Sequence, residues 1–177
     1  MKLIYLFIFF FINIITNTVY GQNIVVVNIQ SIIDNNQNYI DTVKQIDIYQ
    51  QRYFENFEKR EKNLQKISKN IEETKLILNE NEINKKIDDY NNQLANLKID
   101  IEEFNIHYQQ QIINIREIIL REIIILLENY AIKNSIDLIL DSTSYLIASN
   151  SIDITEIINN KLKNINIKLE YEDFEKN

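Results

Sequence analysis

The stretch INKKIDDYNNQLANLKIDIEEFNIHYQQQIINIREI, residues 83–118, decides the fold of this chain. Its apolar positions follow one another by alternating steps of four and three, the a/d pattern of a coiled-coil helix sustained over about five heptads. The positions of this seam are Ile83, Ile87, Tyr90, Leu94, Leu97, Ile101, Phe104, Tyr108, Gln111, Ile115 and Ile118. Towards residue 127 the apolar stripe becomes wider than one partner helix can cover, which predicts additional contacts with other subunits.

A second, less regular seam precedes the first and has polar lapses at Gln50, Arg60 and Thr74. Its members are Val43, Ile46, Tyr53, Phe57, Leu64, Ile67, Ile71 and Leu78. The polar run Asn79-Glu80-Asn81-Glu82 separates the two seams. We therefore predict an antiparallel coiled-coil hairpin with its tip near residues 79–84. Each arm would have about 45 residues and a length of about 65 to 70 Å.

Short apolar runs flank the hairpin and predict a small β-containing base. The run IVVVNI from Ile24 is β-branched, as is typical of a buried strand, and IDLILD at residues 136–141 predicts a second. Residues 145–148 predict a third strand, and a last helix follows Asp153, with Asp153 or Ser151 as its cap. Gly21 is the only glycine and proline is absent, which favours a fold with few turns. The predicted class is α+β, mostly α.

Such a three-stranded base has open edges, so we expect it to form an oligomer. The residues predicted to build the oligomeric base are Ile24, Val25, Val26, Val27, Ile29, Ile136, Leu138, Ile139 and Leu140.

The N-terminus has the features of a secretory signal. Lys2 precedes an apolar run that ends at Ile15, and a polar stretch then leads to Val19-Tyr20-Gly21, so we predict cleavage between Gly21 and Gln22. The apolar run is short for a membrane span, although an uncleaved anchor is the alternative. The predicted organisation is a signal at 1–21, base at 22–35, hairpin at 36–134, base at 135–167 and a frayed tail at 168–177.

Composition and motifs argue against catalysis and against nucleic-acid binding. The formal net charge is −7, and loss of Lys2 with the signal makes it more negative. Without glycine beyond Gly21 there is no phosphate-binding loop, and without cysteine there is no thiol chemistry. His107 is the only histidine, and we interpret it as a residue beside the seam. The sequence therefore predicts no catalytic residue, no metal ligand and no cofactor.

Paired carboxylates on the arms are interpreted as solvated helix faces, because consecutive residues do not face each other on a helix. These pairs are Glu72-Glu73, Asp88-Asp89 and Glu102-Glu103.

The arms carry candidates for contact with a protein ligand. Tyr49 and Phe54 lie off the seam, and amphipathic rings suit adhesive surfaces. A local basic stretch adds charged candidates. These are Lys59, Arg60, Lys62, Lys66, Lys69 and Lys75. The other arm aromatics occupy seam positions, for which packing is the simpler interpretation.

The two ends of the predicted base resemble the Skp/OmpH family of periplasmic chaperones. The similar stretches are residues 24–31 and 136–163, and the hairpin between them is similar in length and heptad character. The second stretch includes Asp137, Asp141, Ser149, Asn150, Asp153, Ile154 and Thr155.

The resemblance implies a homotrimer of the periplasm with tentacle-like arms around a cavity. There it would hold unfolded outer-membrane β-barrel proteins without ATP and prevent their aggregation, with at most peripheral membrane contact. Members of the family are basic, whereas this chain is acidic, so electrostatic attraction of such clients and a lipopolysaccharide site are not transferred. The alternative function is a periplasmic coiled-coil structural or adaptor protein.

Overall fold

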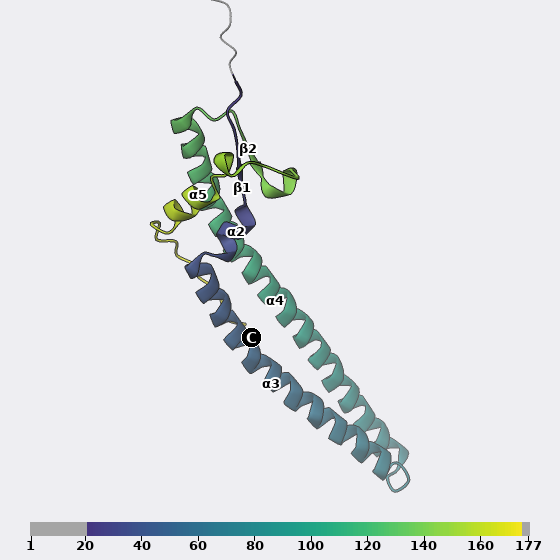
Figure 1. Cartoon of the computed structure of the whole chain (residues 1–177). Coiled ribbons are helices and arrows are strands. Elements are labelled where there is room, and N and C mark those ends of the chain that lie inside the picture. The colour runs from purple at the N-terminus through teal and green to yellow at the C-terminus, as the bar shows by residue number, and fades with distance from the viewer. Residues whose placement is uncertain (1–20, 175–177) are drawn as a thin grey trace, which may run out of the picture.

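A long helical hairpin extends from a small α/β base in the computed structural model, which describes residues 21–174 (Figure 1). The chain begins with strand β1 (Ile24–Val27) and the short helix α2 (Ile29–Asp34). Helices α3 (Gln37–Thr74) and α4 (Glu80–Asn134) form the hairpin. Strand β2 (Leu138–Asp141), the 3-10 turns η1 (Ser142–Ser144) and η2 (Asn150–Ile152), and helix α5 (Thr155–Leu162) complete the base.

The hairpin confirms the predicted fold class, but its helices differ in length. Helix α3 has 38 residues and α4 has 55. The C-terminal part of α4 extends beyond the start of α3 and packs against β1, α2 and α5 of the base. The chain turns between the helices at residues 75–79, slightly before the predicted tip near residues 79–84, because residues 80–84 already belong to α4. Asn79 caps α4 by accepting a hydrogen bond from the Glu82 N–H at 3.0 Å, and the Glu82 carboxylate accepts one from the Asn79 N–H. This reciprocal capping box fixes where the second helix starts.

The predicted seams face each other along the hairpin. Ile83, Leu97 and Ile115 of α4 are buried, as are Ile46 and Leu64 of α3. Both helices present side chains at a and d spacing, so the two apolar stripes cover one another over much of their length.

One polar lapse in the first seam has a partner across the hairpin. Arg60 donates a hydrogen bond to the Asp100 carboxylate at 2.6 Å, and Asp100 is buried. A buried carboxylate requires a charged or hydrogen-bonding partner, so this pair favours the register in which Arg60 lies opposite Asp100.

The base contains a two-stranded parallel sheet. Ile24 of β1 lies opposite Leu138 of β2, and the pairing continues to Val27 and Asp141. Parallel strands need a long crossover connection, and here the whole hairpin is that connection. Both ends of the hairpin are thereby held at one place.

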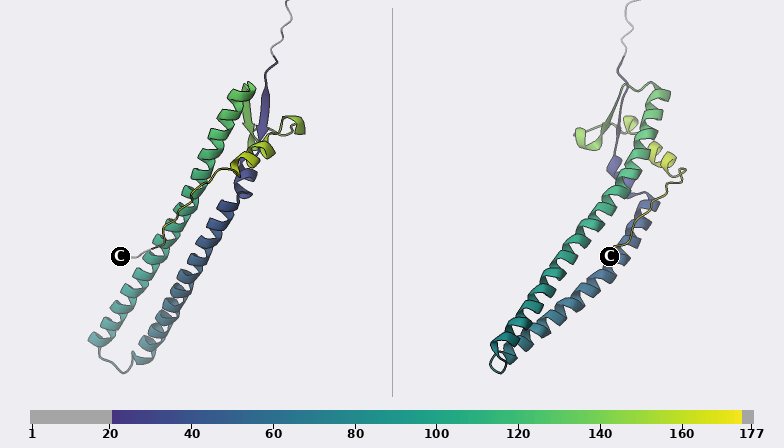
Figure 2. Two further views of the ribbon diagram at one scale, coloured as in Figure 1. Left: turned by 90° about the vertical axis from the view of Figure 1, so that its left-hand side faces the viewer. Right: turned by 180° about the vertical axis from the view of Figure 1, so that it is seen from behind.

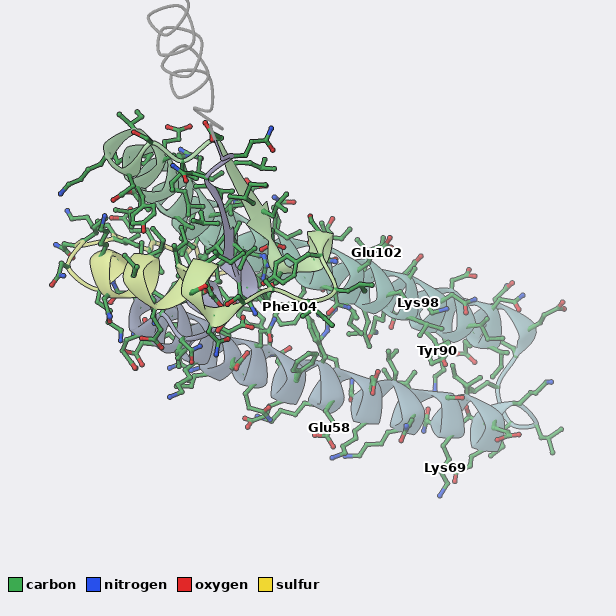
Figure 3. All side chains as sticks on the ribbon, turned by 45° about the horizontal axis from the view of Figure 1, so that its top comes forward. Glu58, Lys69, Tyr90, Lys98, Glu102 and Phe104 are labelled. Atoms are coloured by element: carbon green, nitrogen blue, oxygen red, sulfur yellow. The ribbon has the colours of Figure 1, made fainter. Side chains whose placement is uncertain are left out.

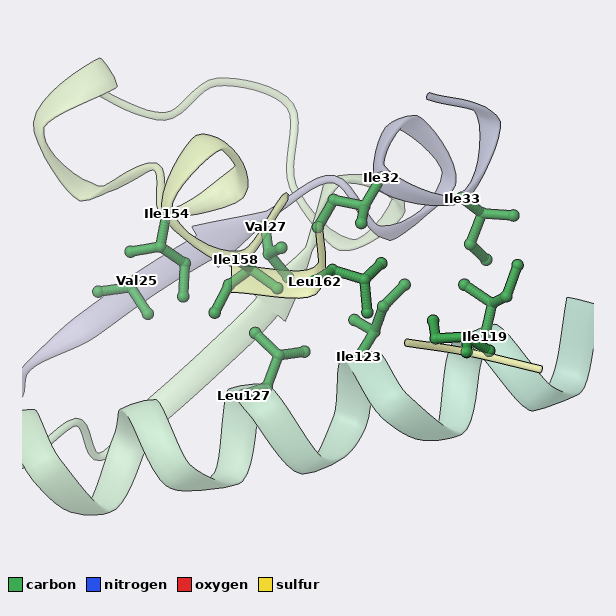
Figure 4. Packing of buried hydrophobic residues seen from close by; sticks show 11 residues of the cluster. Val25, Val27, Ile32, Ile33, Ile119, Ile123, Leu127, Ile154, Ile158 and Leu162 are labelled. Atoms are coloured by element: carbon green, nitrogen blue, oxygen red, sulfur yellow. The ribbon is translucent and has the colours of Figure 1, made fainter. Parts of the chain in front are cut away.

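The core of the base lies between the sheet and the helices (Figure 4). Val25 and Val27 of β1 point towards α4 and α5, where they meet Ile123, Ile158 and Leu162. The other buried members are Ile32, Ile33, Ile119, Leu127, Ile154 and Ile167. The wide apolar stripe of α4 is therefore covered in part within one chain, by β1, α2 and α5.

Hydrogen bonds join residues before the hairpin to residues after it within the base. The Asn23 N–H donates to Asp137 at 2.8 Å, the Ile29 N–H to Asp141 at 3.1 Å, and the Asn28 N–H to the Thr155 hydroxyl at 2.8 Å. Burial raises the pKa of Asp141, but hydrogen bonds from the Thr143 side chain and from backbone N–H groups together lower it by more. The net pKa is therefore below its usual value. The carboxylate is thus ionised where it caps the start of α2.

The predicted third strand is wrong. Residues 145–148 have no regular structure, and the free edge of β1 is instead met by the segment before α5, where the Ile154 N–H donates to the Val26 carbonyl at 2.9 Å. With that edge occupied, Leu146 and Ile147 find no strand to pair with and are almost completely exposed.

The prediction of a frayed tail from residue 168 is also wrong for its described part. Residues 163–174, called the returning segment, leave α5 and run back along the hairpin (Figure 2). Ile167 packs in the base core, and Phe174 is buried against the hairpin aromatics. Apolar side chains on one side of this segment explain why it adheres. Residues 1–20 of the predicted signal lie outside the described residues, and within the described range no helix is long and apolar enough to cross a membrane.

Candidate functional site

An aromatic cluster occupies the half of the hairpin nearer the base. Phe104 of α4 is fully buried at its centre, with the rings of Tyr53, Phe57 and Tyr108 at centroid distances of 5.2, 5.2 and 4.8 Å. In Figure 3 Phe104 lies between the two arms, whereas Glu58 and Lys69 point away from the hairpin. The Phe57 and Tyr108 contacts are edge-to-face and the Tyr53 contact is tilted, and such ring contacts favour one arrangement of the side chains.

Polar groups on the rim of this cluster face the returning segment. The Tyr108 hydroxyl donates to Asp173 at 2.8 Å, and burial together with that hydrogen bond raises the pKa of Tyr108 far above its usual value. His107 Nε2 lies 2.8 Å from the Glu172 carbonyl, and the Tyr53 hydroxyl donates to the Phe174 carbonyl. His107 therefore contacts backbone, consistent with its interpretation as a residue beside the seam.

The two aromatic candidates predicted from the sequence have different surroundings. Tyr49 is half-buried, because Tyr171 of the returning segment packs edge-on against it at 5.5 Å. Arg52 lies over the Tyr49 ring at 4.9 Å, a cation–π contact. Phe54 is 47% exposed, and its ring makes a T-shaped contact with Phe104 at a centroid distance of 5.4 Å.

Lys59, Lys62, Lys66 and Lys69 form an exposed face along α3, Lys75 lies in the turn after α3, and Arg60 pairs with Asp100. Lys62 pairs with Glu58 at 2.6 Å, and the hydrogen bond and charge of Lys62 lower the pKa of Glu58. Lys69 approaches Glu73 at 3.8 Å. The remaining basic candidates, Lys59, Lys66 and Lys75, are exposed. Exposed ion pairs are weak, but they reduce the field of this face.

The hairpin tip carries an apolar surface that the sequence reasoning missed. Leu76 and Ile77 lie in the turn between α3 and α4 and are 96% and 80% exposed. The sequence signal was present, because two adjacent apolar residues stand off the heptad pattern beside a polar break. Hollows of about 470 and 450 Å³ lie nearby between the arms and are lined partly by Leu78 and Ile71.

The predicted oligomer residues divide between core and surface. Val25, Val26 and Val27 are buried within the single chain, whereas Leu138 is 45% exposed. Within residues 21–174 the outer edge of β2 has no partner strand. The exposed pair Leu146 and Ile147 lies in the loop that follows η1. Among the described residues, the base therefore has one unpaired strand edge and several exposed apolar side chains.

Nothing in the described residues resembles a metal centre. They contain no group of three or more histidine, cysteine or acidic residues that could hold an ion. The adjacent carboxylates of the arms are exposed on their helices, as expected for solvated faces.

The profile of the family described as outer membrane protein (OmpH-like) matches residues 23–162. The chain belongs to the OmpH-like family. This match covers the base and the whole hairpin of the OmpH-like chain, and it stops at the end of α5, before the returning segment. It supports the resemblance inferred from the flanking stretches, and the OmpH-like chaperone family is not an enzymatic one.

A solved structure has the same fold. It is described as a candidate outer membrane chaperone (OmpH-like) from Caulobacter crescentus CB15 and superposes with a TM-score of 0.72 at 9% sequence identity. The alignment covers 89% of this chain and 94% of that chain. No curated protein sequence matches this chain. The likeness therefore shows that the hairpin-on-base architecture is shared while nearly all side chains differ.

Proposed function

We propose that this OmpH-like protein is an ATP-independent holdase of the periplasm, which binds unfolded outer-membrane proteins as a homotrimer and prevents their aggregation. The observation that carries the proposal is the family match over residues 23–162, which includes every element of base and hairpin. Export would be accompanied by cleavage between Gly21 and Gln22, and N-terminal sequencing of the secreted protein tests that step.

The hairpin suits the holding of unfolded chains. Leu76 and Ile77 are exposed apolar side chains in the turn at the tip, far from the base, and Phe54 is an exposed aromatic side chain midway along α3. Unfolded barrel strands expose apolar surface and unpaired edges, which aggregate unless covered. Several weak apolar contacts shield such strands without demanding one sequence.

Uncovered surface in the base supports an oligomer, and the number of three copies is what the family resemblance implies. The open outer edge of β2 and the exposed side chains of Leu138, Leu146 and Ile147 need a cover that the described residues do not provide. A second and third copy of the base would supply strands and apolar surface of matching kind.

Light scattering tests the function directly. The mature protein is measured alone and after dilution of a urea-denatured outer-membrane barrel protein into the mixture, at several salt concentrations. A trimer that keeps the client soluble in a stoichiometric complex is expected. Because the basic face is partly neutralised by Glu58 and Glu73, the complex should survive high salt. A stable oligomer that leaves the client to aggregate would contradict the holdase and favour an adaptor role.

Two pairs of exposed aliphatic residues serve as controls for each other. Leu76→Ser with Ile77→Ser at the tip should weaken client holding and leave the oligomer intact. Leu146→Ser with Ile147→Ser in the base should weaken association and leave the helical content intact. Both pairs lie in loops and are strongly exposed, so neither change should unfold the chain. Equal effects of both pairs on client holding would contradict a role for the tip.

A further inference from the structure

The segment that follows α5 lies outside the family match and has the pattern of a β-strand. Ile167, Leu169 and Tyr171 are buried or half-buried against the rest of the chain, while Lys168 and Glu170 between them are exposed. Alternation of apolar and charged residues with period two is the pattern of a strand with one covered face. Residues 166–174 of the returning segment therefore resemble a single strand that lies on the hairpin. From this point on, these residues are called the tail.

Six side chains of the hairpin receive the tail. They are called the tail site and are Tyr49, Tyr53, Phe104, His107, Tyr108 and Gln111.

Phe174 is the apolar anchor of the tail. It is 9% exposed, and its ring centroid lies 5.5 Å from that of Tyr53, 5.6 Å from that of Phe104 and 5.6 Å from that of His107. Tyr171 packs against Tyr49 one turn of α3 away from Tyr53. Two aromatic side chains, three residues apart in the tail, thus enter an aromatic surface that spans both arms.

Three polar groups of the tail site bind the backbone of the tail, and a fourth, the Tyr108 hydroxyl, donates to the Asp173 side chain at 2.8 Å. Gln111 accepts a hydrogen bond from the Glu172 N–H at 3.2 Å, and His107 Nε2 contacts the Glu172 carbonyl at 2.8 Å. The Tyr53 hydroxyl donates to the Phe174 carbonyl. Every peptide chain has these N–H and carbonyl groups, so the three backbone contacts do not depend on the tail's own side chains.

We infer that the tail site binds one extended segment of an unfolded outer-membrane protein, and that the tail is an internal occupant which such a segment displaces. The inference rests on the proposed holdase function. Strands of membrane β-barrels alternate apolar and polar residues and carry aromatic residues near their ends, the chemistry that the tail itself presents. Backbone hydrogen bonds together with aromatic contacts accept many such strands.

An internal occupant has two consequences. It covers an aromatic surface that would otherwise be an aggregation hazard when no client is present. It also lowers the apparent affinity for a client, because only the fraction of molecules with the tail released is competent to bind. Release of the tail by mutation should therefore raise the affinity of the site.

The test uses the full chain with the tail released by Tyr171→Ala and Phe174→Ala. The matched control is Lys168→Ala with Glu170→Ala, two exposed changes in the same segment that remove one charge of each sign. The probe is a fluorescein-labelled synthetic peptide of residues 165–177, whose binding is followed by fluorescence anisotropy. The released variant should bind it about tenfold more tightly than the wild type, and the control should not differ from the wild type.

Competition with a denatured barrel protein identifies the natural ligand. The client should displace the labelled peptide from the released variant, and the released variant should hold the client more tightly than the wild type. Peptide binding that the client does not displace would show that the tail is only a structural brace and would overturn the inference. Unchanged peptide affinity in the released variant would overturn it as well.

Light scattering of the wild type distinguishes failure of the tail-site inference from failure of the proposed holdase function. If the wild type keeps the client soluble but the client does not compete for the tail site, the inference fails and the holdase stands. If neither the wild type nor the released variant keeps the client soluble, the proposed function itself fails.

A further experiment crosslinks the tail to the tail site. The chain has no cysteine, so Gln111→Cys and Glu172→Cys can be joined by a short thiol crosslinker, which should abolish peptide binding.

Discussion

Replacement of Phe104 by alanine should be among the most destabilising changes in the hairpin. The side chain is fully buried and lies within 4.8 to 5.6 Å of five other aromatic rings, two of which are Tyr108 and Phe174. The ring joins both arms and the tail, so its loss leaves a cavity that none of the three can fill alone.

The expected cost follows from that burial. A buried Phe→Ala change costs about 3 to 5 kcal/mol of unfolding free energy, which includes the lost transfer energy and the cavity. Five ring contacts at favourable centroid distances place Phe104 at about 4 kcal/mol. Phe104→Leu retains much of the volume and should cost about 1 to 2 kcal/mol.

Urea unfolding followed by far-ultraviolet circular dichroism measures the effect, at one fixed protein concentration because the protein is expected to associate. The control is Ile106→Ala on the same helix, whose side chain is 60% exposed and should change the free energy by less than about 0.5 kcal/mol. A loss below about 1 kcal/mol for Phe104→Ala would refute the assignment of this ring as the centre of the hairpin core.

Asp141→Asn should destabilise the base by about 1 kcal/mol at pH 7, because the folded state depresses the pKa of Asp141 through hydrogen bonds from Thr143 and the first turn of α2. That stability is present above the unfolded pKa and is lost as pH falls through the lowered pKa of the folded state. The urea midpoints of wild type and variant should therefore converge below the ordinary pKa of 3.8. A gap between the midpoints that stays constant with pH would contradict the assignment. Arg60→Met should cost about 2 kcal/mol by leaving the buried Asp100 carboxylate without its guanidinium, and a second change, Asp100→Leu, should recover most of the loss in a double-mutant cycle. Equal, additive losses would argue against the pair. Asn79→Ala should lower the urea midpoint by the equivalent of about 1 kcal/mol through loss of the capping box, and an unchanged midpoint would show that the tip does not need it.

The sequence by itself determined the elements that depend on local periodicity. The alternation of four and three placed Leu97, Phe104 and Ile115 in the interior of the hairpin, where they are buried. The polar run at residues 79–82 located the reversal of the chain to within a few residues, although the turn lies at residues 75–79 and the run itself caps and opens α4. These features follow from the geometry of a single helix, which is why they can be predicted without knowledge of any partner.

Tertiary structure decided everything that depends on which surfaces meet. The polar lapse at Arg60 became a cross-hairpin contact only because Asp100 lies opposite it, forty positions away along the chain. The predicted third strand failed because the segment before Thr155 took the free edge of β1. The tail docked because its alternating apolar side chains found an aromatic surface formed jointly by two helices. Such contacts depend on competition between distant segments for the same edge or surface, and no local pattern contains the outcome of that competition.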